Sequence, residues 1–154
     1  MPSEYQTAVI TCAAVLGIKT VVVALATVRA RIMSSTFNFK NPEATNLLGA
    51  LFDKSGLLLT FINKGGSKQM VDIFERISLN NATNEPIFVG LALAGGLAAA
   101  PPPAILVKIF LYARIGHNLA FAFMPVTKSA VPRTSCYVAG AGVTGLVAAM
   151  LLAA

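Results

Sequence analysis

The chain has 154 residues, of which 56% are hydrophobic and only 12% carry a charge, and its mean hydropathy is +0.73. Soluble domains are about one-quarter charged, so the composition excludes an ordinary soluble protein and indicates one membrane domain with several spans. The net charge of +6 does not indicate a nucleic-acid-binding protein, because the basic residues are neither clustered nor interleaved with aromatic side chains. We therefore expect the lipid bilayer as a partner of the chain, and no nucleic acid.

Four apolar segments follow one another along the chain, and each is close to the ~20 residues that cross a bilayer as a helix. They cover residues 5–28, 77–100, 104–124 and 134–154. None has the alternating pattern of a membrane-barrel strand, and only helices or closed barrels satisfy their backbone hydrogen bonds in lipid. The sequence thus predicts an all-α fold, an integral membrane four-helix bundle that forms a single domain over residues 1–154.

The connection between the first two segments, residues 29–76, is long and basic. Its basic residues are Arg29, Arg31, Lys40, Lys54, Lys64, Lys68 and Arg76. The third connection, before the fourth segment, also holds two basic residues, whereas the second connection and the N-terminal tail hold none. Because basic loops stay in the cytosol, we expect both basic connections there and both termini in the lumen or the intermembrane space. A moderately apolar stretch, Leu47–Ile62, has two charges in its middle, so we expect it at the membrane interface or docked on the bundle.

The third segment is apolar enough to span the membrane, yet it contains Lys108, Arg114 and His117. A central Arg or Lys costs about 2.5–3.5 kcal/mol on the insertion scale, so such residues usually face a partner, a bundle interior or a polar ligand. Arg114 lies in the middle of the segment, with little chance to reach the lipid headgroups. Two interpretations stay open. Either Arg114 faces a ligand, or Glu85 of the second segment forms a buried ion pair with Lys108 or Arg114.

Arginine, amide and imidazole side chains gather toward the cytosolic end of the predicted bundle. They comprise Arg29, Arg76, Asn80, Arg114 and His117. Such a group suits a small anionic ligand with carboxylates, because the planar guanidinium binds carboxylate oxygens in pairs. Alternatively, Arg29 and Arg76 are flanking anchors that reach lipid headgroups, and the asparagines cap and join helices. No zinc-ligand spacing occurs, so no metal site is expected.

Four short motifs point to one family. They are Asn41-Pro42-Glu43 in the first connection, Leu79-Asn80-Asn81 in the second segment, Ala113-Arg114-Ile115-Gly116-His117 in the third, and the small-residue run Val138–Thr144 in the fourth. On these residues the chain resembles the membrane-associated proteins in eicosanoid and glutathione metabolism, and most closely the microsomal glutathione transferases. The resemblance covers most of the chain, and the motif in the third segment is the most specific.

The resemblance implies a protomer that forms a homotrimer in the endoplasmic reticulum or a mitochondrial membrane. Proteins of this family bind glutathione between protomers near the cytosolic face, and they conjugate it to lipophilic electrophiles or use it to reduce lipid hydroperoxides. Arg114 matches the arginine that stabilises the glutathione thiolate, and a cation beside sulfur raises the thiolate fraction. Arg29, Arg76 and Asn80 match positions that hold the carboxylates and backbone of glutathione, and His117 is assigned to the same binding group.

The chain departs from the family pattern at the start of the second segment and within the third. Where the family has Arg, His and Glu, this sequence has Glu75, Ser78 and Thr83, and two family tyrosines are replaced by Gly116 and Phe121. These changes favour a second hypothesis, a non-catalytic member that serves as a structural or accessory subunit of a larger membrane complex, for example a mitochondrial one. A small channel is less well supported, because the segments show no inverted repeat. The sequence alone leaves enzymatic activity open.

Overall fold

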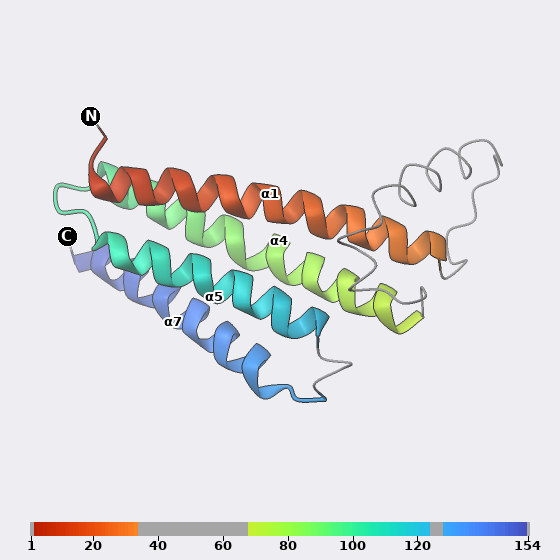
Figure 1. The fold of residues 1–154 in the computed structure, drawn as a ribbon. Coiled ribbons are helices and arrows are strands. Elements are labelled where there is room, and N and C mark those ends of the chain that lie inside the picture. Colours follow the sequence, from red (N-terminus) through yellow and green to blue (C-terminus); the bar gives the residue numbers. More distant parts are fainter. Residues whose placement is uncertain (1, 34–67, 124–127, 154) are drawn as a thin grey trace. The chain divides into compact units, whose positions relative to one another are not determined.

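The computed structural model describes residues 2–33, 68–123 and 128–153. These residues form four α-helices and no strand, which confirms the predicted all-α class (Figure 1). The helices are α1 (Glu4–Met33), α4 (Lys68–Leu97), α5 (Ala104–Ala122) and α7 (Val131–Ala153). They belong to two compact units, a first unit of Met1–Thr20 with Leu79–Ala154 and a second unit of Val21–Ser78. The predicted interfacial stretch, Leu47–Ile62, lies outside the described residues.

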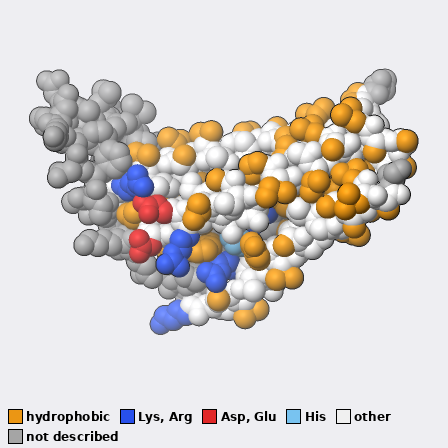
Figure 2. All heavy atoms as spheres, turned by 180° about the vertical axis from the view of Figure 1, so that it is seen from behind, with side chains coloured by type: hydrophobic (Ala, Val, Ile, Leu, Met, Phe, Trp, Pro, Cys, Tyr) orange, Lys and Arg blue, Asp and Glu red, His pale blue; other side chains and the backbone are white. Residues whose placement is uncertain are grey.

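Three of the described helices are long and apolar enough to cross a membrane. The qualifying segments are Glu4–Val28, Ala104–Ala122 and Val131–Ala153. Large apolar side chains remain exposed on them, including Ile18, Ile105 and Leu152, and one end of the face in Figure 2 shows hydrophobic and uncharged side chains almost throughout. Such a surface suits lipid rather than water. The polar helix α4 is not among the qualifying segments, so its crossing of the bilayer stays a prediction.

Helices α1 and α4 extend beyond the predicted spans into the predicted connection over residues 29–76. Residues 29–33 continue α1, and residues 68–76 already belong to α4. Hydropathy marks only where a segment leaves the apolar layer, whereas helix hydrogen bonds continue into water where no Pro or Gly interrupts them. At its other end α4 stops at Leu97 rather than Ala100, because the prolines that follow at 101–103 disfavour helix in the residue before them.

The core of the first unit draws on all four helices. Leu16 of α1, Phe88 of α4, Phe110 of α5 and Val147 of α7 all belong to one buried cluster. The rings of Phe88 and Phe110 stack with their centroids 3.6 Å apart and their planes 8° from parallel. Inside a membrane this close packing supplies most of the attraction between helices, because lipid tails are as apolar as the side chains themselves. The packing fixes the faces of α4 and α5 that carry the polar residues.

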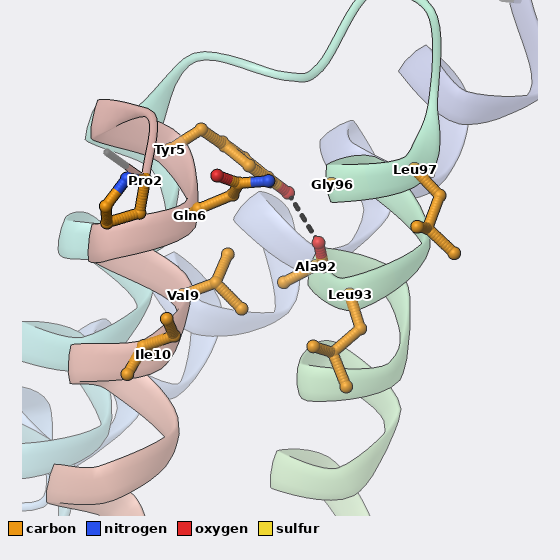
Figure 3. A pocket seen from close by; sticks show the side chains of 9 residues that line it. All are labelled: Pro2, Tyr5, Gln6, Val9, Ile10, Ala92, Leu93, Gly96 and Leu97. Atoms are coloured by element: carbon orange, nitrogen blue, oxygen red, sulfur yellow. Dashed lines mark hydrogen bonds between the residues drawn. The ribbon is translucent and has the colours of Figure 1, made fainter.

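Tyr5 closes the other end of the first unit, where the N-terminal turns of α1 meet the last turns of α4. Its hydroxyl donates a hydrogen bond of 2.9 Å to the carbonyl oxygen of Ala92 (Figure 3). An apolar groove of about 270 Å³ lies beside it, with Leu93 and Gly96 in its wall. The phenol approaches Gly95 so closely that a Cβ on that glycine would lie 2.5 Å from the Tyr5 Oη. This end of the unit is therefore apolar, and Tyr5 packs closely against Gly95. The buried polar and charged side chains lie further along the helices.

Candidate functional site

Arg114 is the largest fully buried side chain of the described residues, with 1% of its surface exposed. It lies on the face of α5 that packs against α7, and Gly140 of α7 makes room for it. A Cβ on Gly140 would lie 3.5 Å from the Arg114 Cδ, which is ordinary contact, so a larger side chain would have to displace the arginine. The small residue on α7 thus permits a long cation to lie inside the unit.

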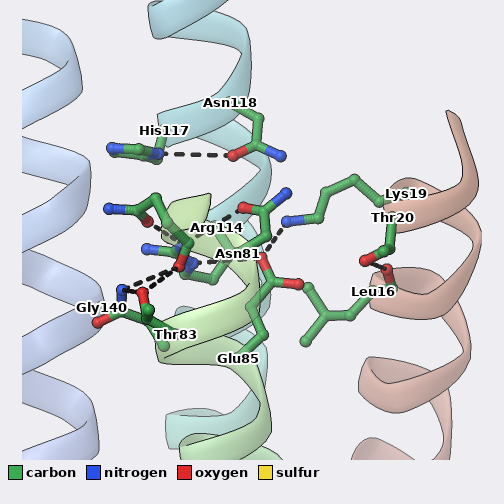
Figure 4. A network of polar contacts seen from close by, with 12 residues as sticks. Leu16, Lys19, Thr20, Asn81, Thr83, Glu85, Arg114, His117, Asn118 and Gly140 are labelled. Atoms are coloured by element: carbon green, nitrogen blue, oxygen red, sulfur yellow. Dashed lines mark hydrogen bonds and ion pairs between the residues drawn. The ribbon is translucent and has the colours of Figure 1, made fainter. Parts of the chain in front are cut away.

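The guanidinium of Arg114 donates to acceptors on α4 (Figure 4). Its Nη2 donates to the side-chain oxygen of Asn80, to the carbonyl oxygen of the same residue at 3.3 Å, and to the Oδ1 of Asn81 at 3.4 Å. Its Nε lies 3.4 Å from the Oε1 of Glu85. Of the two pairings left open for Glu85, the structure therefore forms the one with Arg114, and it also brings together the predicted site residues Arg114 and Asn80.

Glu85 has a second cationic partner that the sequence analysis did not assign, Lys19 of α1. The Lys19 ammonium donates to the Oε1 of Glu85 as a hydrogen-bonded ion pair. The exposed fractions of the two side chains are 13% for Lys19 and 6% for Glu85, so water screens the pair only weakly. Three helices are joined at this cluster of Lys19, Glu85 and Arg114, which we call the buried ion cluster.

Lys108 does not belong to the buried ion cluster, although the sequence left it as a possible partner of Glu85. Its ammonium pairs instead with Glu4 of α1 at 3.0 Å, and both side chains are substantially exposed. Lys108 precedes Arg114 by six residues, which is about 9 Å along a helix. Lys108 therefore lies beside the first turn of α1, about 9 Å along α5 from Arg114, which contacts Glu85.

His117 lies one turn after Arg114 and is enclosed by aromatic and amide groups. Its ring packs edge-on against Phe121, with centroids 5.8 Å apart, and tilted against Tyr137 at 6.1 Å. Its Nδ1 lies 3.5 Å from the Oδ1 of Asn118. The ring is thus buried beside the cluster. In the described part of the chain, no group of three or more His, Cys, Asp or Glu residues could hold a metal ion.

The two remaining predicted site residues, Arg29 and Arg76, belong to the second unit. Arg76 is exposed on α4, and Arg29 lies in the last turns of α1. In the same unit Glu75, which replaces a family arginine, accepts hydrogen bonds from Arg31 at 3.0 and 2.7 Å. Arg31 therefore balances the negative charge of Glu75 within the second unit. The participation of Arg29 and Arg76 in one site with Arg114 stays a prediction.

Two positions where family tyrosines are replaced serve packing between α5 and α7. A Cβ on Gly116 would lie 3.0 Å from the Sγ of Cys136, so a larger side chain at this position would have to shift the Cys136 side chain. Phe121 is buried, and the guanidinium of Arg133 lies 4.9 Å from the centre of its ring. The replacements fit the close approach of the two helices in this chain.

Comparison with known proteins places this architecture in a family. The family model that matches is the MAPEG family, over residues 9–153 of the 154. No curated protein matches the chain, and no solved structure does either. The match includes most of the first apolar helix, the other two apolar helices entirely, and all three residues of the buried ion cluster. The chain is an integral membrane protein and belongs to the MAPEG family.

Proposed function

We propose that this MAPEG protein conjugates glutathione, as a co-substrate, to lipophilic electrophiles, or uses it to reduce lipid hydroperoxides. In the conjugation, the thiolate sulfur forms a bond to the electrophilic carbon and the leaving group departs with the electron pair of the broken bond. Arg114 is the proposed catalytic residue, because a fixed guanidinium beside the sulfur stabilises the thiolate relative to the thiol. Family membership supports this function at the level of the family.

The observation that carries the proposal is the charge of the buried ion cluster. Lys19 and Arg114 share the single carboxylate of Glu85, so their formal charges leave one positive charge in an enclosed place. A guanidinium fully neutralised by its own carboxylate would attract a thiolate poorly. Because Lys19 takes the closer position on Glu85, Arg114 keeps its attraction for an anion. Electrostatic groups held in place in a dry site are among the strongest contributors to catalysis.

The other candidate residues complete the proposed glutathione site. Asn80 offers its amide beside Arg114, and His117 lies one turn further along α5. We propose that Arg29 and Arg76 bind the carboxylates of glutathione as paired donors. We also propose a homotrimer, in the membrane of the endoplasmic reticulum or a mitochondrion. Chemical crosslinking in membranes, followed by electrophoresis, tests the trimer, and a ladder that ends at the monomer contradicts it.

The activity is tested with full-length protein purified in detergent, glutathione and a lipophilic aryl halide, with a lipid hydroperoxide in a parallel assay. Arg114→Met should lower the turnover number on the order of 100-fold, as the loss of one preorganised charge does elsewhere. Lys108→Met is the matched control, because it removes a cation from the same helix that is exposed and paired with Glu4, and it should leave the rate unchanged. Wild-type protein without activity on either substrate contradicts the proposal, as does equal activity of wild type and Arg114→Met.

One observation favours a second candidate function, a structural subunit without catalysis. Arg114 already donates to Asn80, Asn81 and Glu85 and is 1% exposed, so its charge is largely engaged within the unit. In that case the buried ion cluster serves to hold α1, α4 and α5 together. This candidate predicts that the chain co-purifies with a larger membrane complex in mild detergent. A free homo-oligomer with no other subunit argues against it.

A further inference from the structure

The formal charges in the buried ion cluster do not cancel. Lys19 and Arg114 each contact the carboxylate of Glu85, and the three side chains are exposed by only 13%, 2% and 6%, respectively. One positive charge therefore remains where little water can screen it. Such a charge is unfavourable inside a membrane protein unless an opposite charge or several hydrogen-bonding groups accompany it.

Two buried amides beside the cluster have donors that nothing accepts among the described residues. The Oδ1 of Asn81 accepts from Arg114, which fixes the orientation of this amide and identifies its Nδ2 as the group without an acceptor. The Nδ2 of Asn118 is likewise without one. Both residues are more than nine-tenths buried, and a buried donor without a partner is destabilising. Both donors would be satisfied by an anion.

The helix geometry brings these groups to the same level. Asn81 lies one turn before Glu85 on α4, and Asn118 lies one turn after Arg114 on α5. Because the two helices run in opposite directions (Figure 1), both turns extend toward the same end of the buried ion cluster. Figure 4 shows the two amides on that side of Glu85. The free donors and the unbalanced charge thus lie in one region of the first unit.

We propose that this region is a binding site for one small monovalent anion, and that Lys19 creates it. Lys19 neutralises Glu85, Arg114 supplies the attracting charge, and the amides of Asn81 and Asn118 donate hydrogen bonds to the anion. Without Lys19, the carboxylate of Glu85 would balance Arg114 and the region would be neutral. A free inorganic anion and the thiolate of glutathione share the required chemistry. Only the second of these ligands rests on the proposed function.

The test varies the net charge of the cluster while keeping its shape. Lys19→Met makes the cluster neutral, Glu85→Gln gives it two positive charges, and the double variant restores the single positive charge of the wild type. The probe is thiocyanate, added to full-length protein in detergent at constant ionic strength with gluconate as the replaced anion. Its affinity is read from the rise of the thermal unfolding midpoint, which increases with ligand concentration for any ligand that binds only the folded state.

We expect Lys19→Met to bind thiocyanate at least about tenfold more weakly than wild type, and Glu85→Gln at least about tenfold more tightly. The double variant should bind like the wild type, and so should Lys108→Met, which removes an exposed cation instead. Equal affinities across the set overturn the proposal. A double variant as weak as Lys19→Met also overturns it, because that result assigns Lys19 a packing role alone. If Glu85→Gln does not fold, the comparison of wild type, Lys19→Met and the double variant decides by itself.

A second titration of the same variants uses glutathione and separates the two ligand sources. If thiocyanate affinity follows the charge of the cluster while glutathione does not bind, the anion site stands and the proposed conjugation is contradicted. If both affinities follow the charge, the thiolate occupies the site. If glutathione binds equally to all variants and thiocyanate binds to none, the anion site is overturned and glutathione binds elsewhere.

Discussion

The Oε1 of Glu85 and the Nε of Arg114 lie 3.4 Å apart between α4 and α5, and both side chains are almost completely buried. Because Glu85 also pairs with Lys19, its removal leaves two cations in the same enclosed place. Breaking a buried pair on one side costs about 3–5 kcal/mol. We therefore expect Glu85→Gln to lower the free energy of unfolding in detergent by that amount, measured from chemical denaturation followed by circular dichroism.

The matched control for this prediction is Glu4→Gln. Glu4 also forms an ion pair that joins two helices, with Lys108 at 3.0 Å, but both side chains are exposed. Exposed pairs contribute about 0–1 kcal/mol, so the control should unfold almost like the wild type. If Glu85→Gln lowers the free energy of unfolding as little as Glu4→Gln does, the buried ion cluster does not stabilise the protein.

Gly95 has no room for a side chain. A Cβ there would lie 2.5 Å from the Tyr5 Oη and 3.0 Å from the Pro102 Cδ, so Gly95→Ala forces the phenol away from its hydrogen bond to Ala92. We expect a loss of about 1–3 kcal/mol, as for other overpacked sites. Gly90→Ala on the same helix has nothing within 4 Å of the new Cβ and should be neutral or slightly stabilising. Thermal unfolding of both variants measures the difference, and a Gly95→Ala protein as stable as Gly90→Ala contradicts the prediction.

The stacked pair of Phe88 and Phe110 holds α4 against α5 on the apolar side of the buried ion cluster. Both rings are at most 1% exposed. Phe88→Ala should cost about 3–5 kcal/mol, because it leaves a cavity in the core. Phe123→Ala removes the same group from an exposed position, 43% exposed, and should have little effect. Denaturation of the two variants side by side tests whether this stacking stabilises the unit, and similar midpoints would count against it.

Gly140 leaves room for Arg114 because it has no side chain, and its carbonyl oxygen accepts a hydrogen bond of 2.9 Å from the Thr144 hydroxyl. Gly140→Leu should displace the guanidinium from Asn80 and Glu85, because the new side chain would enter the volume of the arginine. We expect a loss of conjugation activity comparable to that of Arg114→Met. Gly142→Leu on the same helix meets nothing within 4 Å at its Cβ and should keep the activity. Steady-state rates with glutathione and an aryl halide measure both variants, and a fully active Gly140→Leu refutes the dependence on Arg114 position.

The sequence predicted the all-α class and the most informative residue, Arg114, for a simple physical reason. A membrane imposes a strong length and composition requirement on helices, and a charge in the middle of an apolar segment needs a partner or a ligand. The polar residues at the start of the second segment also pointed to the face that meets Arg114, and Asn80 does contact it. Each of these signals depends on the residues of a single segment, so it can be recognised in the sequence without knowing how the helices pack.

The role of Lys19 could not be predicted, because it depends on how three helices pack. Lys19 and Glu85 are 66 residues apart, and each is an isolated charge in its own segment. Their opposite signs were a signal for an interhelical pair, but Lys108 and Arg114 offered equally plausible partners for Glu85. The extension of α1 and α4 beyond the predicted spans could not be predicted either, because hydropathy follows the lipid boundary and helix hydrogen bonds do not. The packing of Gly116 against Cys136 was likewise visible only in the folded chain.

Glutathione binding that depends on Arg114 is the central claim, and titration calorimetry of the detergent-purified full-length protein tests it most directly. Wild type should show saturable binding at millimolar or lower concentrations, Arg114→Ala should show none at equal helix content, and Lys108→Ala should bind like the wild type. The absence of binding to the wild type, or equal binding to wild type and Arg114→Ala, would contradict the account.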